Sequence, residues 1–220
     1  IAWFIGLFIA EGSRSDDTIQ FSLNADELDL WEQIQRIAVS YGGSATHTIE
    51  GHSMSVRGYG KVLNACIDYL MSGHTAKDKA FSPVVWRYSN HFLEFLMLGY
   101  LAGDGSWDDA NNRWRLGFTR NYNLERDIRT ACARLDWQLT LNLATAKYQN
   151  GERPSFRGEI RTETNEHWNT KTRSEIVAIR KARAREFYDI EVEGEKALFA
   201  LASGILSHNS KDNPMPASGG

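Results

Sequence analysis

Two segments of the chain repeat one pattern of hydrophobic positions. Residues 3–13, WFIGLFIAEGS, and residues 95–106, FLMLGYLAGDGS, are apolar runs that end in an acidic residue followed by glycine and serine. Both runs are typical of a helix. The two acids, Glu11 and Asp104, stand at matching places in the two copies.

The same order of elements follows each of these helices. Each acid is followed by an Asp-Asp pair, Asp16–Asp17 or Asp108–Asp109, which is typical of a polar turn. Strand-like alternation and then an amphipathic helix come next, at residues 18–24 and 26–41 in the first copy and at residues 113–121 and 123–136 in the second. Further strands are expected at residues 44–58, 138–148 and 153–162, and a helix at residues 60–71. The pattern predicts an α+β fold in which a duplicated αββαββα unit forms two halves about a pseudo-twofold axis.

Small residues recur at helical spacing on both apolar helices. Gly6 and Ala10 are four positions apart, as are Gly99 and Gly103, so each pair lies on one helix face. Helices that meet through small residues approach closely, and we expect this contact to bring the two acids together. Adjacent carboxylates repel each other unless a cation lies between them. Their oxygens suit Mg²⁺, which also binds phosphate, so the arrangement predicts metal-assisted phosphodiester hydrolysis.

At these positions the sequence resembles the LAGLIDADG homing endonucleases. The resemblance lies in LGYLAGDG at residues 98–105 and in IGLFIAEG at residues 5–12, where the acid is glutamate. It implies a homing endonuclease domain at residues 1–168, with repeats at residues 1–85 and 86–168. Such a domain cleaves double-stranded DNA, here as a monomer.

The resemblance also implies functional residues. Glu11 and Asp104 would hold Mg²⁺ or another divalent cation and act in catalysis, while two saddle-shaped sheets would lie in the DNA major groove. The strand residues expected to face DNA are Gln20, Ser22, Asn24, Arg113, Arg115, Thr119 and Arg120. Arginine and glutamine can hydrogen-bond base edges there. Whether each residue reads a base or grips a phosphate is open at this point.

A lysine precedes the second apolar helix. KDKAFSP at residues 77–83 is similar to the Lys-x-x-x-Pro stretch that precedes the second motif in intein endonucleases. Lys79 is therefore a candidate to polarise water or to stabilise the pentacovalent phosphate. The alternative is a solvated loop lysine. For the second half, Lys147 and Lys171 are both candidates.

The pattern changes to short strands after residue 173. Residues 174–184, 186–194 and 197–204 are rich in β-branched and aromatic residues, and they lead into ILSHNS at residues 205–210. YDIEVEG and GILSHNS resemble the C-terminal splicing block of inteins, in which endonucleases of this family are commonly inserted. The resemblance implies the all-β C-terminal part of a Hint splicing domain at residues 169–209.

The last of these residues fit the chemistry of a splice junction. The Asn209 side-chain amide can attack its own backbone carbonyl to close a succinimide, with His208 as proton donor. Ser210 supplies a hydroxyl nucleophile, and Asp189 is a candidate proton-handling or orienting group. Lys196 stands near the place where many inteins have a histidine.

The sequence does not contain the N-terminal half of such a splicing domain. Ile1 already lies in the first apolar helix. We therefore expect a fragment of a longer protein, or the C-terminal piece of a split intein, with an N-terminal splicing half as partner. Residues 210–220 would then be flanking host-protein sequence.

Composition and charge refine this picture. The chain has 220 residues, 42% of them hydrophobic, and a formal net charge of −3. Residues 1–112 carry 7 Lys and Arg against 14 Asp and Glu, whereas residues 113–183 carry 15 against 8. The basic region could follow a phosphate backbone or be an ordinary solvated surface. Cys66 and Cys132 are expected to be buried free thiols in a reducing, cytoplasmic compartment, and no apolar run has the length of a membrane span.

Three functions fit these features. The leading one is a Mg²⁺-dependent homing endonuclease embedded in the C-terminal portion of an intein. The second is a splicing module whose degenerate endonuclease only binds DNA or is structural, and the third is a noncatalytic binding protein. The presence of both acids favours the first over the second, and GILSHNS disfavours the third.

Overall fold

The computed structural model describes residues 1–148, 151–163, 198–200 and 206–208. The elements of the first half are α1 (Ala2–Glu11), β1 (Gly12–Ser15), β2 (Thr18–Asn24), α2 (Leu28–Ser40), β3 (Ser44–Glu50), β4 (Ser53–Tyr59) and α3 (Lys61–Leu70). The connector contains β5 (Met71–Ser72), β6 (Ala80–Phe81) and the 3-10 helix η1 (Pro83–Arg87). The elements of the second half are α4 (Asn90–Asp104), β7 (Gly105–Asp108), the 3-10 helix η2 (Asp109–Asn111), β8 (Arg113–Thr119), α5 (Tyr122–Leu135), β9 (Gln138–Tyr148) and β10 (Gly151–Arg161). Two short strands, β11 (Leu198–Ala200) and β12 (Leu206–His208), follow.

Each half contains one four-stranded antiparallel sheet. The strand order is β1-β2-β4-β3 in the first half and β7-β8-β10-β9 in the second. Corresponding strands occupy corresponding places, so the predicted duplication is confirmed as a mixed α/β fold. The first hairpins differ in length, because Gly12 pairs with Phe21, nine positions on, whereas Gly105 pairs with Leu116, eleven positions on.

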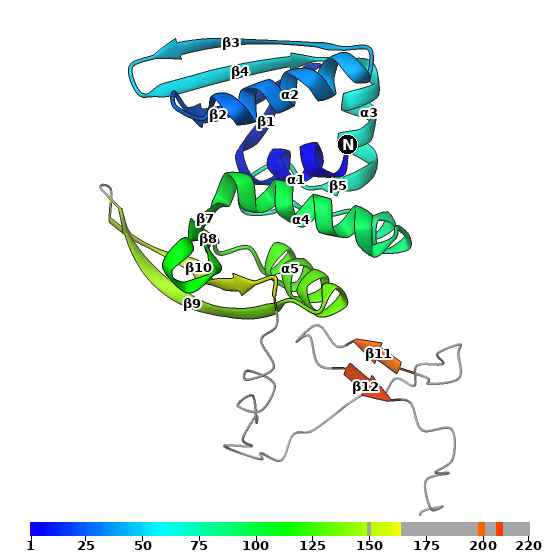
Figure 1. The fold of residues 1–220 in the computed structure, drawn as a ribbon, viewed down its shortest axis with the longest axis vertical. Helices are drawn as coiled ribbons and strands as arrows, with labels where there is room; N and C mark the ends of the chain where they lie inside the picture. The colour runs from blue at the N-terminus through cyan, green and yellow to red at the C-terminus, as the bar shows by residue number, and fades with distance from the viewer. Residues whose placement is uncertain (149–150, 164–197, 201–205, 209–220) are drawn as a thin grey trace, which may run out of the picture.

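The helices α1 and α4 lie side by side between the two sheets (Figure 1). α1 is hydrophobic around its whole circumference, as expected of a helix that is buried on all sides. Its hydrophobic residues from Phe4 to Ile9 are all at most 3% exposed. α2 packs on β3 and β4, and α5 packs on β9, so the helices cover one face of each sheet. The other face is mostly exposed along the strands.

Glycines let the two central helices touch through their backbones. A Cβ atom added to Gly6 would lie 1.9 Å from the carbonyl oxygen of Leu96, and one added to Gly99 would lie 1.9 Å from that of Trp3. A larger residue at either position would force the helices apart, because a backbone carbonyl moves only with its helix. The predicted packing through small residues is confirmed.

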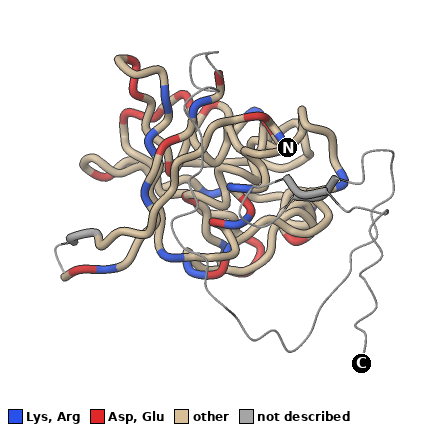
Figure 2. The backbone as a smooth tube through the Cα atoms, turned by 90° about the horizontal axis from the view of Figure 1, so that it is seen from below, with Lys and Arg blue, Asp and Glu red and all other residues tan. Residues whose placement is uncertain are grey.

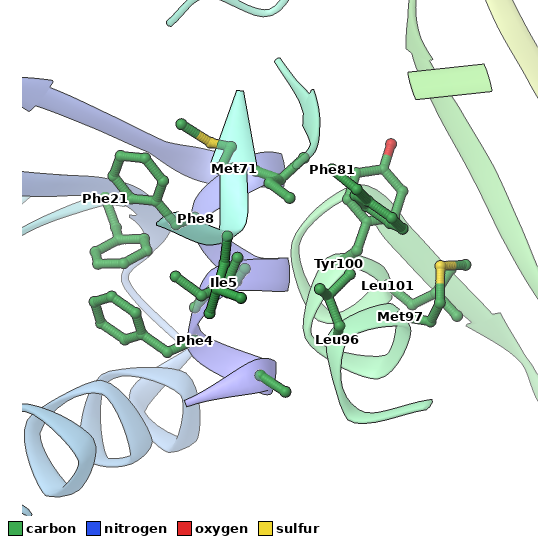
Figure 3. Close-up of a cluster of buried hydrophobic side chains, with 14 of the residues drawn as sticks. Phe4, Ile5, Phe8, Phe21, Met71, Phe81, Leu96, Met97, Tyr100 and Leu101 are labelled. Atoms are coloured by element: carbon green, nitrogen blue, oxygen red, sulfur yellow. The ribbon is translucent and has the colours of Figure 1, made fainter. Parts of the chain in front are cut away.

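Aromatic side chains fix each sheet against its central helix. Phe21 of β2 makes edge-to-face contacts with Phe4 and Phe8 of α1, at ring-centroid distances of 5.4 and 5.9 Å (Figure 3). Tyr100 of α4 contacts Phe118 of β8 in the same way, at 6.4 Å. Pairs of this geometry add to the stabilisation that burial of the rings provides.

Helix α5 holds the connector in place. The Asn121 side chain, at the N-terminal cap of α5, donates to the backbone carbonyls of Ala76 at 3.3 Å and Lys79 at 2.7 Å. The buried Asp127 carboxylate accepts a hydrogen bond of 2.9 Å from the N–H of Phe81. These bonds satisfy backbone groups of the connector, and they tie the connector to the second half.

One local prediction needs correction. Asp16 and Asp17 form the expected turn, with Asp16 in the left-handed region at φ 52°. Asp108, however, is the last residue of β7, and only Asp109 leaves the strand. The turn prediction is therefore wrong for Asp108. The predicted boundary between residues 85 and 86 falls inside η1, before α4 begins.

The C-terminal predictions fall largely outside the described residues. β11 and β12 pair as antiparallel strands, with Leu198 opposite His208. Asn209 and Ser210 lie outside the described residues, as do the strands predicted at residues 174–184 and 186–194.

The predictions for cysteines and membrane spans can also be compared with the structure. Cys66 and Cys132 are both free thiols, Cys132 buried and Cys66 half-buried. None of the helices in the described ranges is both long and apolar enough to cross a membrane.

Candidate functional site

The two acids predicted from the repeat end the two central helices. Glu11 is the last residue of α1, and Asp104 is the last residue of α4. A Cβ atom added to Gly103 would lie 2.6 Å from Ala10 Cβ and 2.9 Å from Glu11 Cγ. The Glu11 side chain thus lies against the α4 backbone, one residue before Asp104. The structure brings the acids together, as the spacing of small residues predicts.

Both acids are in surroundings that disfavour their charged forms. Burial raises the pKa of Glu11 to about 7, and the charges of Asp104 and Glu27 add to this, while Lys79 opposes it. Burial also raises the pKa of Asp104, against the effects of the Tyr100 hydroxyl and the Lys79 ammonium. Neighbouring carboxylates with raised pKa values are typical of a site that accepts a cation or a proton.

Tyr100 lies one helical turn before Asp104 and is 0% exposed. Burial raises its pKa, and the Asp104 charge adds to this. Its hydroxyl makes no hydrogen bond of good geometry within the described residues, although it is close enough to interact with the Asp104 carboxylate. A buried hydroxyl without a partner is costly, so a small movement that joins it to Asp104 would be favourable.

Lys79 reaches the end of α1 from the connector. It is 5% exposed, and its ammonium donates to the carbonyl oxygens of Phe8 at 3.1 Å, Ile9 at 3.2 Å and Gly12. A cation is favoured at this end of a helix, where the carbonyls point outward. Burial lowers the pKa of Lys79, and the two acids oppose this. The alternative of a solvated loop lysine is therefore wrong.

The contacts of Lys79 also restrict what it can do. An ammonium has three N–H donors, and three carbonyls of the α1 end accept them. In this arrangement Lys79 fixes the backbone that carries Glu11. Its predicted direct action on water or phosphate would require one of these bonds to break. Of the two lysine candidates for the second half, Lys147 lies in β9, opposite Glu152 of β10. Lys171 lies outside the described residues.

A cavity opens beside each acid. The cavity beside Glu11 has a volume of about 270 Å³ and is lined by Glu11, Ser22, Asn24, Glu27, Ser53 and Gly103. The cavity beside Asp104 has a volume of about 280 Å³, and its polar lining residues are Asp104, Ser106, Arg115, Ser155 and Arg157. The first cavity therefore has a second acid, whereas the second cavity has two guanidinium groups.

The residues present fit a Mg²⁺ ion. Glu11 and Asp104 supply hard carboxylate oxygens, and the adjacent cavities leave space for the waters and phosphate oxygens with which Mg²⁺ completes its coordination. The described ranges contain no group of three or more His, Cys, Asp or Glu side chains placed so that they could hold a metal ion together. Two protein carboxylates, with water and substrate as further ligands, are the donor set that this part of the chain offers.

The residues predicted to face DNA lie on the uncovered faces of the two sheets, or next to them. In β2 they alternate with buried hydrophobic residues, and those in β8 alternate in the same way with mostly buried ones. Arg120 is exposed directly after β8. The residues placed in this way are Gln20, Ser22, Asn24, Arg113, Arg115, Thr119 and Arg120.

The two uncovered faces differ in chemistry. In the first sheet the register places Gln20 opposite Arg57, and Ser22 opposite Ser55, and most of the outward residues there carry hydroxyl or amide groups. In the second sheet the outward positions of β8 and β10 include several arginines: Arg113, Arg115, Arg153, Arg157 and Arg161. Figure 2 shows acidic and basic positions interspersed along the chain, so net charge alone does not single out one face.

Sequence reasoning missed several residues of the site. Asn121 has the sequence signal of an N-terminal helix cap, but its bond to the Lys79 carbonyl joins residues that lie far apart in the sequence. In the sequence, the position of Tyr100 within an apolar run is typical of an ordinary core residue of a helix. Asp108 reads as a turn residue, although it contacts both Arg113 and Arg115.

Comparisons with known proteins give matches only at the level of structure. No protein-family model matches the chain, and no curated protein matches it. Matching solved structures comprise 37 chains. Mesophilic variants of the homing endonuclease I-DmoI are 12% identical, with a TM-score of 0.49 over 72% of this chain and 86% of theirs. I-DmoI in complex with DNA and Ca is 12% identical, with a TM-score of 0.46 over 71% of this chain and 81% of that one. The N-terminal LAGLIDADG domain of DUF199/WhiA is 10% identical, with a TM-score of 0.47 over 70% of this chain and 73% of that one.

Proposed function

We propose that this chain is a LAGLIDADG-type endonuclease that cleaves double-stranded DNA with Mg²⁺ or another divalent cation. One observation carries the proposal. Two helices packed through glycines bring Glu11 and Asp104 together, between two sheets whose uncovered faces are polar. That is the arrangement expected of an acid pair placed under a bound duplex.

The chemistry follows from the acids and their surroundings. Glu11 and Asp104 would hold the metal ion, which supplies Lewis-acid activation of a phosphodiester and of a water molecule. Without a cation, burial raises the pKa values of both acids, and the charge of Asp104 raises that of Glu11 further, so the site favours a positive partner. Lys79 would keep Glu11 in place by holding the end of α1.

Both sheets would bind the duplex from the same chain. Outward side chains of β2 and β8 have the donors and acceptors that read base edges or grip phosphates. Because both acids and both sheets belong to one polypeptide, we propose that the endonuclease acts as a monomer. We also propose that it acts in the cytoplasm.

One observation favours a second function, a degenerate endonuclease that binds DNA without cutting it. All three donors of Lys79 are used within the protein, and a nuclease that needs this lysine at the phosphate would be inactive in this arrangement. The acid pair itself favours cleavage, because a purely structural role would not need two partly buried carboxylates beside open cavities.

Incubation with a randomised pool of duplex DNA separates these functions. The protein is used first to select bound sequences with EDTA present, and the selected duplexes are then tested for cleavage with Mg²⁺. We expect cleavage by the wild type and no cleavage by Glu11→Gln or Asp104→Asn. The exposed residue Glu32 of α2 provides the matched control, Glu32→Gln, which should cut normally.

The outcomes distinguish the alternatives. Selection of a sequence without any cleavage would support the DNA-binding function and refute the nuclease. Failure to bind any duplex would refute both. Cleavage that persists in both acid variants would show that the site lies elsewhere.

We further propose that residues 169–209 form the C-terminal part of an intein splicing domain. The support is the sequence YDIEVEG and GILSHNS, with β12 ending at His208 in a pair with β11. Asn209 would cyclise, and Ser210 would first accept the upstream chain, once an N-terminal splicing half is supplied.

Mass spectrometry after co-expression with an N-terminal splicing half tests this second proposal. We expect loss of residues 210–220 and a succinimide or asparagine terminus at Asn209. Asn209→Ala should abolish the release, whereas Ser210→Ala should block ligation but permit some release. Unchanged release by Asn209→Ala would refute the splicing function and leave the nuclease proposal untouched.

A further inference from the structure

Four charged side chains form one cluster on the uncovered face of the second sheet: Asp108, Arg113, Arg115 and Glu159. Arg115 donates to Asp108 Oδ2 from Nε at 3.1 Å and from Nη2 at 2.7 Å. Arg113 donates from Nε to the same oxygen at 3.1 Å, and from Nη1 to Glu159 Oε2. The cluster therefore has two positive and two negative charges, all in contact.

Asp108 is itself held firmly. The Asn111 side-chain amide donates to Asp108 Oδ1 at 3.2 Å and to Oδ2 at 3.0 Å. The Asp108 side chain is 10% exposed, against 61% for that of Arg115. The hydrogen bonds from Asn111, Arg115 and Arg113 lower the pKa of Asp108 to about 2. Asp108 thus remains ionised at neutral pH and acts as a fixed anchor beneath an exposed arginine.

The contact with Asp108 determines which N–H donors of Arg115 remain available to a ligand. A guanidinium group is a planar fork with five N–H donors. Asp108 occupies the edge formed by Nε and Nη2, so Nη1 and the second N–H of Nη2 form the remaining edge. Two parallel donors on one edge match the O6 and N7 acceptors of guanine in the major groove. A neutralised and oriented guanidinium is a weak phosphate anchor but a good reader of a base edge.

Arg157 provides the contrast on the same face. It lies on the next strand, opposite Gly117 of β8, and is exposed. The described residues include no ion-pair partner for it. Arg157 and Arg115 both line the cavity beside Asp104, so they would meet the same stretch of duplex. A free arginine there keeps its full charge for a phosphate.

We infer that Asp108 is a positioning residue that makes Arg115 a guanine-reading side chain, while Arg157 grips the phosphate backbone. The inference rests on the proposed binding of double-stranded DNA and names the residues that set its specificity.

The duplication strengthens this assignment. In the first half, Ser13 pairs with Gln20 and Ser15 pairs with Thr18. The matching pairs in the second half are Ser106 with Arg115 and Asp108 with Arg113. Asp108, Arg113 and Arg115 thus have uncharged counterparts in the first half, whereas Glu159, opposite Arg115, corresponds to Arg57, opposite Gln20. The two halves would read different sequences, so the bound site should be non-palindromic, with guanine in the part that meets the second sheet.

Selection from a randomised duplex pool with EDTA present, followed by fluorescence anisotropy, tests the inference. The specificity ratio is the affinity for the selected duplex divided by that for a scrambled duplex of equal length. Asp108→Asn keeps the shape of the side chain but removes the anchoring charge. We expect its specificity ratio to fall roughly tenfold. We also expect stronger binding to the scrambled duplex, because the freed guanidinium groups can contact phosphates. The slope of log K against log salt concentration should then be steeper by about one.

Two further variants separate the roles of the arginines. Arg115→Lys keeps the charge but loses the fork, so selection should no longer enrich guanine at the position read by the wild type, while nonspecific binding remains. Arg157→Gln is the matched control and should weaken binding to both duplexes by the same factor, with a salt slope shallower by about one. Thermal melting checks that each variant is folded.

Several results would refute the inference about Asp108 and Arg115. An Asp108→Asn variant with the specificity ratio and salt slope of the wild type would show that the cluster is only a surface ion pair. Retention of the guanine preference by Arg115→Lys would also refute the inference. If the wild type binds DNA but selects no sequence, the inference fails while DNA binding stands. If the wild type binds no DNA, both fail together.

Discussion

Replacing Glu11 with glutamine should make the metal-free protein more stable at pH 8. The pKa of Glu11 is raised from its ordinary 4.5 to about 7, chiefly by burial. The folded state therefore holds the Glu11 proton more tightly than the unfolded state does. Between pH 4.5 and 7 the unfolded chain loses this proton first, so the free energy of unfolding falls as pH rises. Above pH 7 the whole cost of the charged form is present.

The magnitude follows from the two pKa values. The interval from 4.5 to about 7 corresponds to about 3.4 kcal/mol, at about 1.36 kcal/mol for each pKa unit. Glu11 is only partly buried, and solvent screens part of this cost. We therefore expect Glu11→Gln to raise the free energy of unfolding by roughly 1–3 kcal/mol at pH 8. The gain over the wild type should be smaller near pH 5, where the wild-type carboxyl is largely protonated.

Urea denaturation at pH 5 and pH 8, with EDTA present, measures the effect. Glu32→Gln on α2 is the control and should show no comparable pH-dependent gain. Addition of Mg²⁺ at pH 8 should stabilise the wild type more than Glu11→Gln, because a ligand that binds only the folded state stabilises it. A Glu11→Gln protein that is no more stable than the wild type at pH 8 would refute the reasoning. It would mean that the surroundings of Glu11 do not disfavour its charge.

Further predictions concern the residues that hold the acid pair in place. Lys79→Met should lower the free energy of unfolding in urea by roughly 2–4 kcal/mol, because the carbonyls of Ile9 and Gly12 lose the Lys79 donor and that of Phe8 keeps only the N–H of Gly12. A loss below about 0.5 kcal/mol would refute the capping role. Asn121→Ala should cost roughly 1–3 kcal/mol in the same assay, through the lost helix cap and the lost bond to the Lys79 carbonyl, and an unchanged midpoint would contradict this. Gly99→Ala should cost more than about 2 kcal/mol, since its Cβ would meet the Trp3 carbonyl oxygen at 1.9 Å. Gly117→Ala, whose Cβ meets nothing nearer than 3.8 Å, is the control, and equal thermal shifts for the two would refute close backbone packing.

Local sequence patterns predicted much of the fold. The apolar runs ending at Glu11 and Asp104 gave both central helices, because a helix without a polar face has to be buried on all sides. Strict alternation gave β2 at the predicted residues 18–24. The spacing of small residues gave the helix contact, since residues four apart share a face. These signals lie within a few turns of chain, where sequence and geometry are directly linked.

Only the tertiary structure decided which side chains meet across the fold. The sequence predicts Lys79 as a catalytic lysine or a solvated loop residue, and only the structure shows that its ammonium caps the end of α1, 67 to 71 positions away in the sequence. Asp108 was read as a turn residue, because Asp-Asp is a turn signal wherever it occurs. The longer second hairpin keeps Asp108 in β7, opposite Arg113. Strand register and the packing of segments that are distant in the sequence set such contacts, and no local pattern shows which side chains will meet. The sequence thus determined the elements and the acid pair, while the packing of the two halves determined how each charge is used.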